Sequence, residues 1–308
     1  MKYIYMLAGD EHEHDLALVE ALALSGGEAC GAKVVQADRL IDLARTGYTA
    51  CGLELLASGE GAAETAGQIR EQGLAADGFA IEVRRIPRGL KVGRHEVANE
   101  LALVIDGSPN LDSPSVQFLA LVTDERVWFG RKLEAGEPEW QRFAQKPHDF
   151  SSALPSQAAR AICNILVRGG ERVIDPCCGT GTFLLHAASL GAHTTGCDIN
   201  KKMVGATNKN LKHFGFEATA SIGDAADVAG SYDLVLANVP YGKMTATSDE
   251  RLAGMVANIA TLAPRGAIVA TSDLSDVIRG AGAEVRQVLR LAKFSITRRI
   301  FIFERAGV

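Results

Sequence analysis

Long apolar segments are missing from this 308-residue chain. No uninterrupted apolar run approaches the roughly 20 residues that a membrane-spanning helix needs, so we expect no membrane segment. The N-terminus is basic and then apolar, as in a signal peptide, but acidic residues from Asp10 onward interrupt the apolar stretch. A first strand is the better interpretation, and we expect a cytoplasmic protein.

Metal-binding patterns are missing as well. The six cysteines form no C-x-x-C pair, and the seven histidines are scattered along the chain. A structural zinc site needs ligands at short, regular spacing, so the sequence predicts no metal. Reduced and mostly buried thiols are the expected state of the cysteines.

Positive charge is scarce overall, because the formal net charge is −5, a value that does not indicate a nucleic-acid binder. One short segment differs from the rest. Between residues 82 and 94 a single acid, Glu82, accompanies five basic residues: Arg84, Arg85, Arg88, Lys91 and Arg94. Taken alone, such a cluster is more typical of a solvated surface than of a phosphate-binding site.

The C-terminal half, residues 151–308, alternates short β-branched runs with helical patterns. We expect strands at 172–175, 193–198, 218–222, 232–236 and 266–271, followed by a terminal pair at 284–291 and 297–304. This alternation predicts an α/β fold with a doubly wound, mainly parallel sheet. The terminal pair is too closely spaced for a crossover helix and predicts an antiparallel edge.

The N-terminal part, residues 1–133, has no glycine-rich nucleotide motif and predicts a separate compact α+β unit. Strands are expected at 2–7, 49–56, 79–85, 116–122 and 126–130, and helices at 14–25, 62–72 and 94–103. The segment 134–150 carries acidic residues together with Gly136, Pro138 and Pro147, and it predicts a linker.

A glycine-containing loop, Asp175-Pro-Cys-Cys-Gly-Thr-Gly-Thr182, follows the first strand of the α/β part and opens a helix. Doubly wound sheets bind ligands at such positions. Gly179 and Gly181 allow tight turns close to a ligand, although a G-x-G alone is a weak signal. Asp198 ends the second strand and Asp224 follows the third, where a ribose and an adenine amino group could be bound.

The charge of the loop separates two cofactors. An acid at Asp175 would repel a pyrophosphate, whereas it attracts a sulfonium and an amino-acid ammonium. The sequence therefore favours S-adenosylmethionine over a nicotinamide dinucleotide. The residues expected around the cofactor are Asp175, Cys177, Gly179, Thr180, Gly181, Thr182, Asp198, Ile199, Asp224, Ala225 and Asn238.

A second motif, Asn238-Val-Pro-Tyr-Gly242, follows the fourth strand, and in isolation it is typical of an ordinary turn. Beside a cofactor site it suits a base. The exocyclic amine of a base is a poor nucleophile, so methyl transfer needs its N–H groups held with the lone pair aimed at the methyl carbon. Asn238 supplies an acceptor, and Tyr241 can stack on an extruded base. We expect Asn238, Pro240 and Tyr241 to be catalytic.

These motifs resemble the Rossmann-fold amino-methyltransferases, whose base motif is Asn/Asp-Pro-Pro-Tyr. The segment from Lys146-Pro-His148 to Pro155 is similar to a motif of the THUMP-containing branch, which packs beside the cofactor. Residues 112–130 resemble the closing hairpin of a THUMP domain, and Phe294–Arg298 resembles the branch's terminal hairpin. The resemblance implies a class I methyltransferase domain at 151–308 and a THUMP-like RNA-binding domain at about 45–133. In that context we expect the basic residues of 84–94 to contact RNA.

The resemblance is strongest to the archaeal and eukaryal tRNA guanine-N2 methyltransferases that act at position 10, and it implies tRNA as the partner. Val239 stands where the family usually has proline, and Asn238 stands where the tRNA guanine enzymes often have aspartate. Adenine-N6 methylation of RNA or DNA therefore remains an alternative. A non-catalytic RNA-binding protein with a degenerate methyltransferase fold is a second alternative.

Overall fold

The computed structural model describes residues 1–150, 153–217, 219–240, 248–293 and 296–305. The chain forms two compact units. The first contains Met1–Ala8, Ala21–Ala44 and Tyr48–Gly136, and the second contains Gly9–Glu20, Arg45–Gly47 and Glu137–Val308. In the described part of the chain, no helix is long and apolar enough to cross a membrane.

The boundary between the units lies inside the predicted linker, but that linker is shorter than expected. Residues Glu139–Ala144 form a helix, α4, that belongs to the second unit. Pro138 precedes its first turn, where a fixed φ and a missing N–H are tolerated. Phe143 is buried and packs in the core cluster that also contains Leu184 and Leu211. The proline that suggested an irregular linker therefore begins a helix.

The first unit is built on a mixed sheet whose seven described strands follow the order β2-β3-β1-β4-β7-β6-β5. Only β5 and β6 run parallel. The helices α2 and α3 contact β4 and β5 from one face, and their apolar side chains join a core cluster with Phe79, Phe118 and Phe129. The elements are β1 (Tyr3–Leu7), α1 (His14–Ser25, shared with the second unit), β2 (Glu28–Gly31), β3 (Val34–Ala37), η1 (Leu43–Arg45), β4 (Thr49–Gly59), α2 (Ala62–Glu71), β5 (Phe79–Arg85), α3 (Arg94–Ala102), β6 (Val116–Val122) and β7 (Val127–Lys132).

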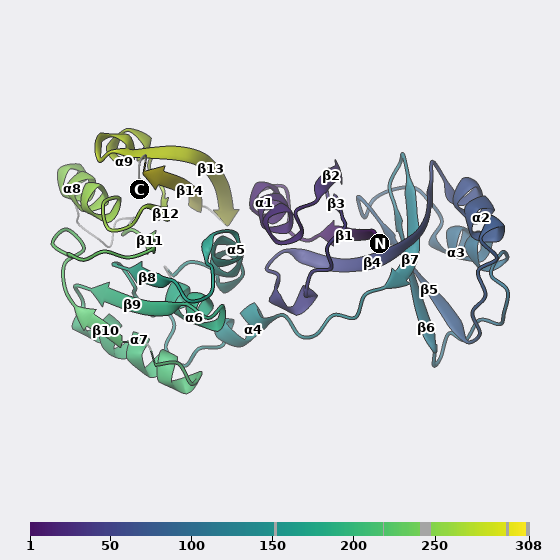
Figure 1. Ribbon diagram of the computed structural model, residues 1–308, viewed down its shortest axis with the longest axis horizontal. Helices are drawn as coiled ribbons and strands as arrows, with labels where there is room; N and C mark the ends of the chain where they lie inside the picture. The colour runs from purple at the N-terminus through teal and green to yellow at the C-terminus, as the bar shows by residue number, and fades with distance from the viewer. Residues whose placement is uncertain (151–152, 218, 241–247, 294–295, 306–308) are drawn as a thin grey trace. The chain divides into compact units, whose positions relative to one another are not determined.

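The second unit contains a second sheet, with the strand order β10-β9-β8-β11-β12-β14-β13 (Figure 1). The first five strands in this order are parallel, and β14 is antiparallel to both neighbours. This confirms the predicted doubly wound sheet with an antiparallel edge. The strands are β8 (Arg172–Asp175), β9 (His193–Asp198), β10 (Thr219–Ile222), β11 (Leu234–Asn238), β12 (Arg265–Ala270), β13 (Ala283–Lys293) and β14 (Ile296–Arg305).

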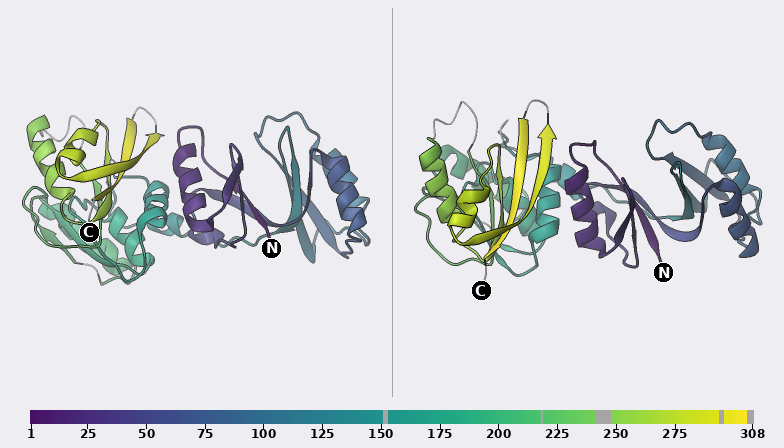
Figure 2. Two further views of the ribbon diagram at one scale, coloured as in Figure 1. Left: turned by 45° about the horizontal axis from the view of Figure 1, so that its top comes forward. Right: turned by 90° about the horizontal axis from the view of Figure 1, so that it is seen from above.

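Helices cover both faces of this sheet, as the alternation of strands and helices predicts. On one face α5 (Ser156–Leu166) contacts α6 (Thr182–Ser189), which in turn contacts α7 (Lys201–His213). On the other face α8 (Asp249–Ile259) contacts α9 (Ser275–Gly280), as Figure 2 also shows. The order of strands reverses direction at β8, which pairs with β9 on one side and β11 on the other. Ligands bind at the carboxyl ends of the strands at such a reversal.

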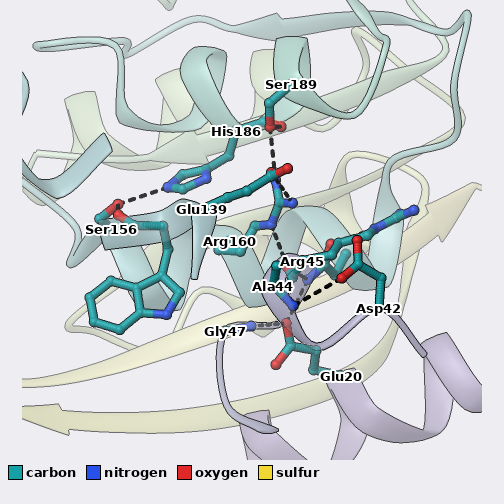
Figure 3. Close-up of polar contacts among 12 residues, drawn as sticks. Glu20, Asp42, Ala44, Arg45, Gly47, Glu139, Ser156, Arg160, His186 and Ser189 are labelled. Atoms are coloured by element: carbon teal, nitrogen blue, oxygen red, sulfur yellow. Dashed lines mark hydrogen bonds and ion pairs between the residues drawn. The ribbon is translucent and has the colours of Figure 1, made fainter. Parts of the chain in front are cut away.

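A buried arginine organises the interior of the second unit (Figure 3). Arg160 of α5 is only 1% exposed, and its guanidinium reaches three acceptors: Glu139 Oε2 at 2.5 Å, the Arg45 carbonyl at 2.6 Å and Ser189 Oγ at 2.8 Å. Five rigid N–H donors suit arginine to such a junction. Desolvation lowers the pKa of Arg160, and the carboxylate of Glu139 opposes that effect.

We predict that Arg160→Ala lowers the free energy of unfolding by about 3–5 kcal/mol, because truncation leaves polar groups unpaired inside the protein. Urea denaturation followed by circular dichroism measures the change. Arg279→Ala is the matched control, since Arg279 forms a surface pair with Asp276 and its loss should cost about 0–1 kcal/mol. Equal losses for the two variants would contradict the structural role of Arg160.

Candidate functional site

The loop after β8 turns twice through the left-handed region of backbone space. Gly179 has φ of 53° and Gly181 has φ of 85°, conformations that side chains with a Cβ rarely adopt. The second turn places Gly181 at the N-cap of α6, which begins at Thr182. The hydroxyl of Thr180 is buried and has no hydrogen-bond partner among the described residues. The loop is thus shaped for close approach, with one polar atom unsatisfied.

Asp198 ties this loop to the end of β9. Its carboxylate accepts hydrogen bonds from the Gly179 N–H at 2.9 Å and from the Asn200 N–H at 2.8 Å. Each carboxylate oxygen has a further lone pair, so both can still accept from a ligand hydroxyl. The structure therefore places the predicted ribose-binding acid beside the loop.

Asp175, at the end of β8, is buried beneath the loop. Its side chain accepts a hydrogen bond from the Cys177 N–H at 3.1 Å. Burial raises the pKa of the carboxyl to about 8; the nearby charge of Asp198 adds to the rise, and the Cys177 N–H counteracts it. Desolvation penalises an unpaired carboxylate, whereas a cation next to it would favour ionisation. The site therefore prefers a positively charged ligand group at this position.

Three thiols surround the same two acids. Cys178 and Cys197 are buried, and Cys177 lies between them and Asp175 in the loop. Burial raises the pKa of all three thiols, and the negative charges of Asp175 and Asp198 raise it further. The thiols are therefore neutral at physiological pH.

Asp224 lies beyond the end of β10 and already has partners. Its carboxylate forms an ion pair with Arg251 of α8 at 2.6 Å and accepts a hydrogen bond from the Ala226 N–H at 3.0 Å. The sequence gave no sign of Arg251, because the two residues are 27 positions apart. A ligand amino group that binds Asp224 shares this carboxylate with the guanidinium.

Two exposed isoleucines lie at the ends of β9 and β10. Ile199 follows Asp198 and is 63% exposed, and Ile222 is 58% exposed. The two strands are adjacent, with Ile222 opposite Asp198. Ile199 was predicted at the cofactor site, whereas Ile222 was not; its position directly before Gly223-Asp224 is the signal that could have indicated it. Together they offer apolar surface for a flat ring.

Asn238 ends β11, next to β8 in the sheet, and its Oδ1 atom is buried without a hydrogen-bond partner among the described residues. An unsatisfied buried acceptor costs about 1–3 kcal/mol, so a donor from a ligand would be favoured here. Pro240 is half-buried, and the predicted stacking residue Tyr241 lies outside the described residues.

Val239 explains its own departure from the usual proline. Its backbone N–H donates to the Val269 carbonyl at 3.1 Å, a bond that proline could not form. Its side chain is 1% exposed and packs in the core beneath α8. The substitution therefore fixes this residue to β12 and does not loosen it.

A buried serine and histidine, which the sequence did not single out, resemble a nucleophilic pair (Figure 3). Ser156 Oγ lies 2.7 Å from the Trp140 carbonyl and 2.9 Å from His186 Nε2. The hydroxyl has one proton and a carbonyl cannot donate, so Ser156 donates to Trp140 and His186 donates to Ser156. Burial lowers the pKa of His186 well below its usual value. The serine is therefore not activated, and the pair connects α4, α5 and α6.

The basic segment of the first unit divides into two groups. Arg84 pairs with Glu82 at 2.5 Å, and Arg85 donates to the carbonyls of Leu90 and Val92. Three further side chains are exposed: Arg88, Lys91 and Arg94. Only this second group presents its charge to solvent.

Comparisons with known proteins agree with the geometry of the second unit. Residues 144–265 match a family described as the RMKL-like methyltransferase domain. The tRNA (guanine(10)-N2)-dimethyltransferase of Methanothermobacter thermautotrophicus is 30% identical over 151 residues, which cover 46% of this chain and 44% of that protein. The Pyrococcus abyssi enzyme of the same name is 28% identical over 173 residues, covering 51% and 52%. The chain thus spans about half the length of the curated relatives that it matches.

The fold extends further than the sequence similarity. The crystal structure of TrmN from Thermus thermophilus aligns with 99% of this chain and 100% of its own, with a TM-score of 0.58 and 22% identity. A possible methylase from Clostridium difficile aligns with 100% of this chain and 99% of its own, with a TM-score of 0.53 and 11% identity. The predicted Rossmann-type methyltransferase fold is confirmed.

The raised pKa of Asp175 generates a prediction about the ligand-free protein. Between about pH 4 and pH 8 the folded protein keeps a proton on Asp175 that the unfolded chain releases, so stability falls as the pH rises. Asp175→Asn removes this effect. We expect its free energy of unfolding, relative to the parent protein, to increase by about 1–4 kcal/mol between pH 5 and pH 8.

Urea denaturation at the two pH values provides the measurement. The control is Asp276→Asn, since Asp276 is fully exposed on α9 and its replacement should change stability by about 0.5 kcal/mol or less at either pH. A difference between Asp175→Asn and the parent that does not vary with pH would show that Asp175 is already ionised in the folded protein.

Proposed function

We propose that the chain is an S-adenosylmethionine-dependent methyltransferase that modifies the exocyclic N2 of a guanosine in tRNA, at position 10. The observation that carries this proposal is the buried, unsatisfied Oδ1 of Asn238 at the end of β11, beside the loop formed by residues 175–182. The names of the archaeal relatives and the matched methyltransferase domain support it.

The chemistry of the donor set fits S-adenosylmethionine. Asp198 can accept from the ribose hydroxyls, and Asp224 can accept from the adenine amino group between Ile199 and Ile222. Asp175 lies where the positively charged methionine part would be held, beneath Gly179 and Gly181. When bound, this cofactor supplies an electrophilic methyl group on a sulfonium. Asp175 ionises toward that positive charge, because a neighbouring cation stabilises the carboxylate.

Asn238 is the residue that orients the base. Its Oδ1 accepts a hydrogen bond from an N–H of the exocyclic amine and so restricts the direction of the nitrogen lone pair. The carboxamide carries no charge, and no strong base is required, because the amine becomes acidic once it is methylated. Positioning and electrostatics therefore supply most of the rate. Pro240 and Tyr241 complete the proposed base-binding motif.

We further propose that the first unit is a THUMP-like domain that binds RNA. The exposed side chains of Arg88, Lys91 and Arg94 are the ones available for phosphates. Arg84 and Arg85 hold the local backbone through Glu82 and the loop carbonyls, so they support this surface from within.

The test is incubation of unmodified tRNA with methyl-tritiated S-adenosylmethionine, followed by nucleoside analysis. We expect N2-methylguanosine. Asn238→Ala should lower kcat about 100- to 1,000-fold, the usual cost of removing one oriented polar contact from a transition state, with the affinity for the cofactor unchanged. Asn238→Asp is the matched variant, because it keeps an acceptor oxygen and should retain more activity than Asn238→Ala.

Each alternative has its own outcome in this assay. Recovery of N6-methyladenosine would replace guanine with adenine as the substrate. A protein that binds the cofactor poorly and leaves tRNA unlabelled would be a non-catalytic RNA-binding protein. Full activity of Asn238→Ala would remove Asn238 from the base site.

A further inference from the structure

A cavity of about 280 Å³ in the second unit contains none of the site residues described above. The segment of residues 144–156 forms one wall, and the beginning of β14 forms the other. Its polar lining includes Lys146, Asp149 and Arg298, and Phe150 and Ile296 lie at its side as partly exposed apolar residues.

The charges in this cavity are unusual because the cations are buried and the acid is not. The side chain of Lys146 is 3% exposed and Arg298 is 4% exposed. Asp149 contacts Lys146 Nζ at 2.6 Å but is itself 56% exposed. Removing a cation from water is costly unless an anion compensates it. Among the described lining residues two cations face one carboxylate, which leaves room for a second anion.

The cavity lies at the same edge of the sheet as the proposed base site. Asn238 pairs with Val269 of β12, and Val269 pairs with Ile300 of β14, so two strand spacings of about 5 Å separate Asn238 from Ile300. Arg298 lies two residues before Ile300, beyond the carboxyl end of β12. Asp175 is one strand further away, on β8. The separation of Arg298 from Asn238 is that between the base edge and the phosphate of one nucleotide.

One buried asparagine fixes the wall of the cavity to the cofactor loop. Asn210 of α7 accepts from the His148 N–H at 3.0 Å and donates to the carbonyls of His148 at 2.7 Å and Thr180 at 2.9 Å. Asn210 is fully buried. The segment that carries Lys146 and Asp149 is thereby held in register with the loop that contains Gly179 and Gly181, which preorganises both sites together.

We propose that this cavity is a phosphate subsite for the RNA substrate. Lys146 and Arg298 bind the backbone phosphate of the nucleotide whose base contacts Asn238, and Asp149 moves into solvent when the phosphate replaces it on Lys146. Phe150 and Ile296 provide apolar contact for the adjoining sugar. This inference rests on the proposed function, because it takes Asn238 as the base-binding residue.

The test is the binding of a fluorescent RNA pentanucleotide with a central guanosine, measured by anisotropy at graded salt with S-adenosylhomocysteine present. Lys146→Gln should weaken binding about tenfold, as expected for the loss of a charged hydrogen bond, and reduce the slope of log affinity against log salt by about 0.7. Arg298→Lys, which keeps the charge, should weaken it less than Arg298→Gln. Asp149→Asn should strengthen binding about two- to fivefold, because it removes the competing carboxylate.

Two controls exclude a merely structural effect. Arg286→Gln removes an exposed arginine at the opposite end of the β13–β14 pair, where it contacts Glu284 and Glu304, and should leave binding unchanged. The affinity of each variant for S-adenosylmethionine should also be unchanged. Because Asp149→Asn is a gain-of-affinity variant at an exposed position, misfolding cannot imitate its result.

Three results would overturn the proposal: weaker RNA binding by Asp149→Asn, an unchanged salt slope for Lys146→Gln, or a loss of affinity for S-adenosylmethionine that shows the cavity to bind the cofactor carboxylate. Failure of the proposed function is a separate outcome. If tRNA acquires no methyl group but the four variants change pentanucleotide binding as expected, the phosphate subsite stands and the assigned reaction does not.

Discussion

The hydrogen bond from the Gly179 N–H to the Asp198 carboxylate is the interaction on which the proposed site depends. It joins the loop after β8 to the end of β9, while Gly179 remains in a left-handed conformation. Thr207 strengthens the connection by donating to the Gly179 carbonyl at 2.7 Å. With this loop fixed, α6 begins at Thr182 and Asp175 stays enclosed below. The same acid that would bind a ribose therefore also shapes the turn against which the cofactor lies.

The sequence indicated correctly those features that depend on local pattern. The strands of the second unit, their parallel order and the loop at residues 175–182 follow from β-branched runs, helical spacing and two glycines. Asp175, Asp198 and Asn238 could be identified because each directly follows a strand, and the carboxyl ends of parallel strands meet at one edge. The short hairpin of β2 and β3 was not predicted, since its strands have four residues each and no alternating pattern strong enough to identify them.

Features that depend on distant partners could not be predicted. Arg251 reaches Asp224 across 27 positions, and Asn210 reaches His148 across 62. Charge counting treated the residues of 84–94 as one cluster, but the fold directs Arg85 to local carbonyls and leaves Arg88 exposed. Likewise, valine at position 239 departs from the family motif in sequence, yet its N–H forms a bond to β12 that proline lacks. In each case the partner is defined only by the folded sheet.

The thiols around the loop have a consequence for chemical durability. A sulfonium methyl donor alkylates soft anions, and a thiolate is the form of cysteine that reacts as a nucleophile. Cys177, Cys178 and Cys197 lie close to the acids that would hold such a donor, but burial and the charges of Asp175 and Asp198 keep them protonated. The acids that attract the donor thus also protect the protein from methylating itself.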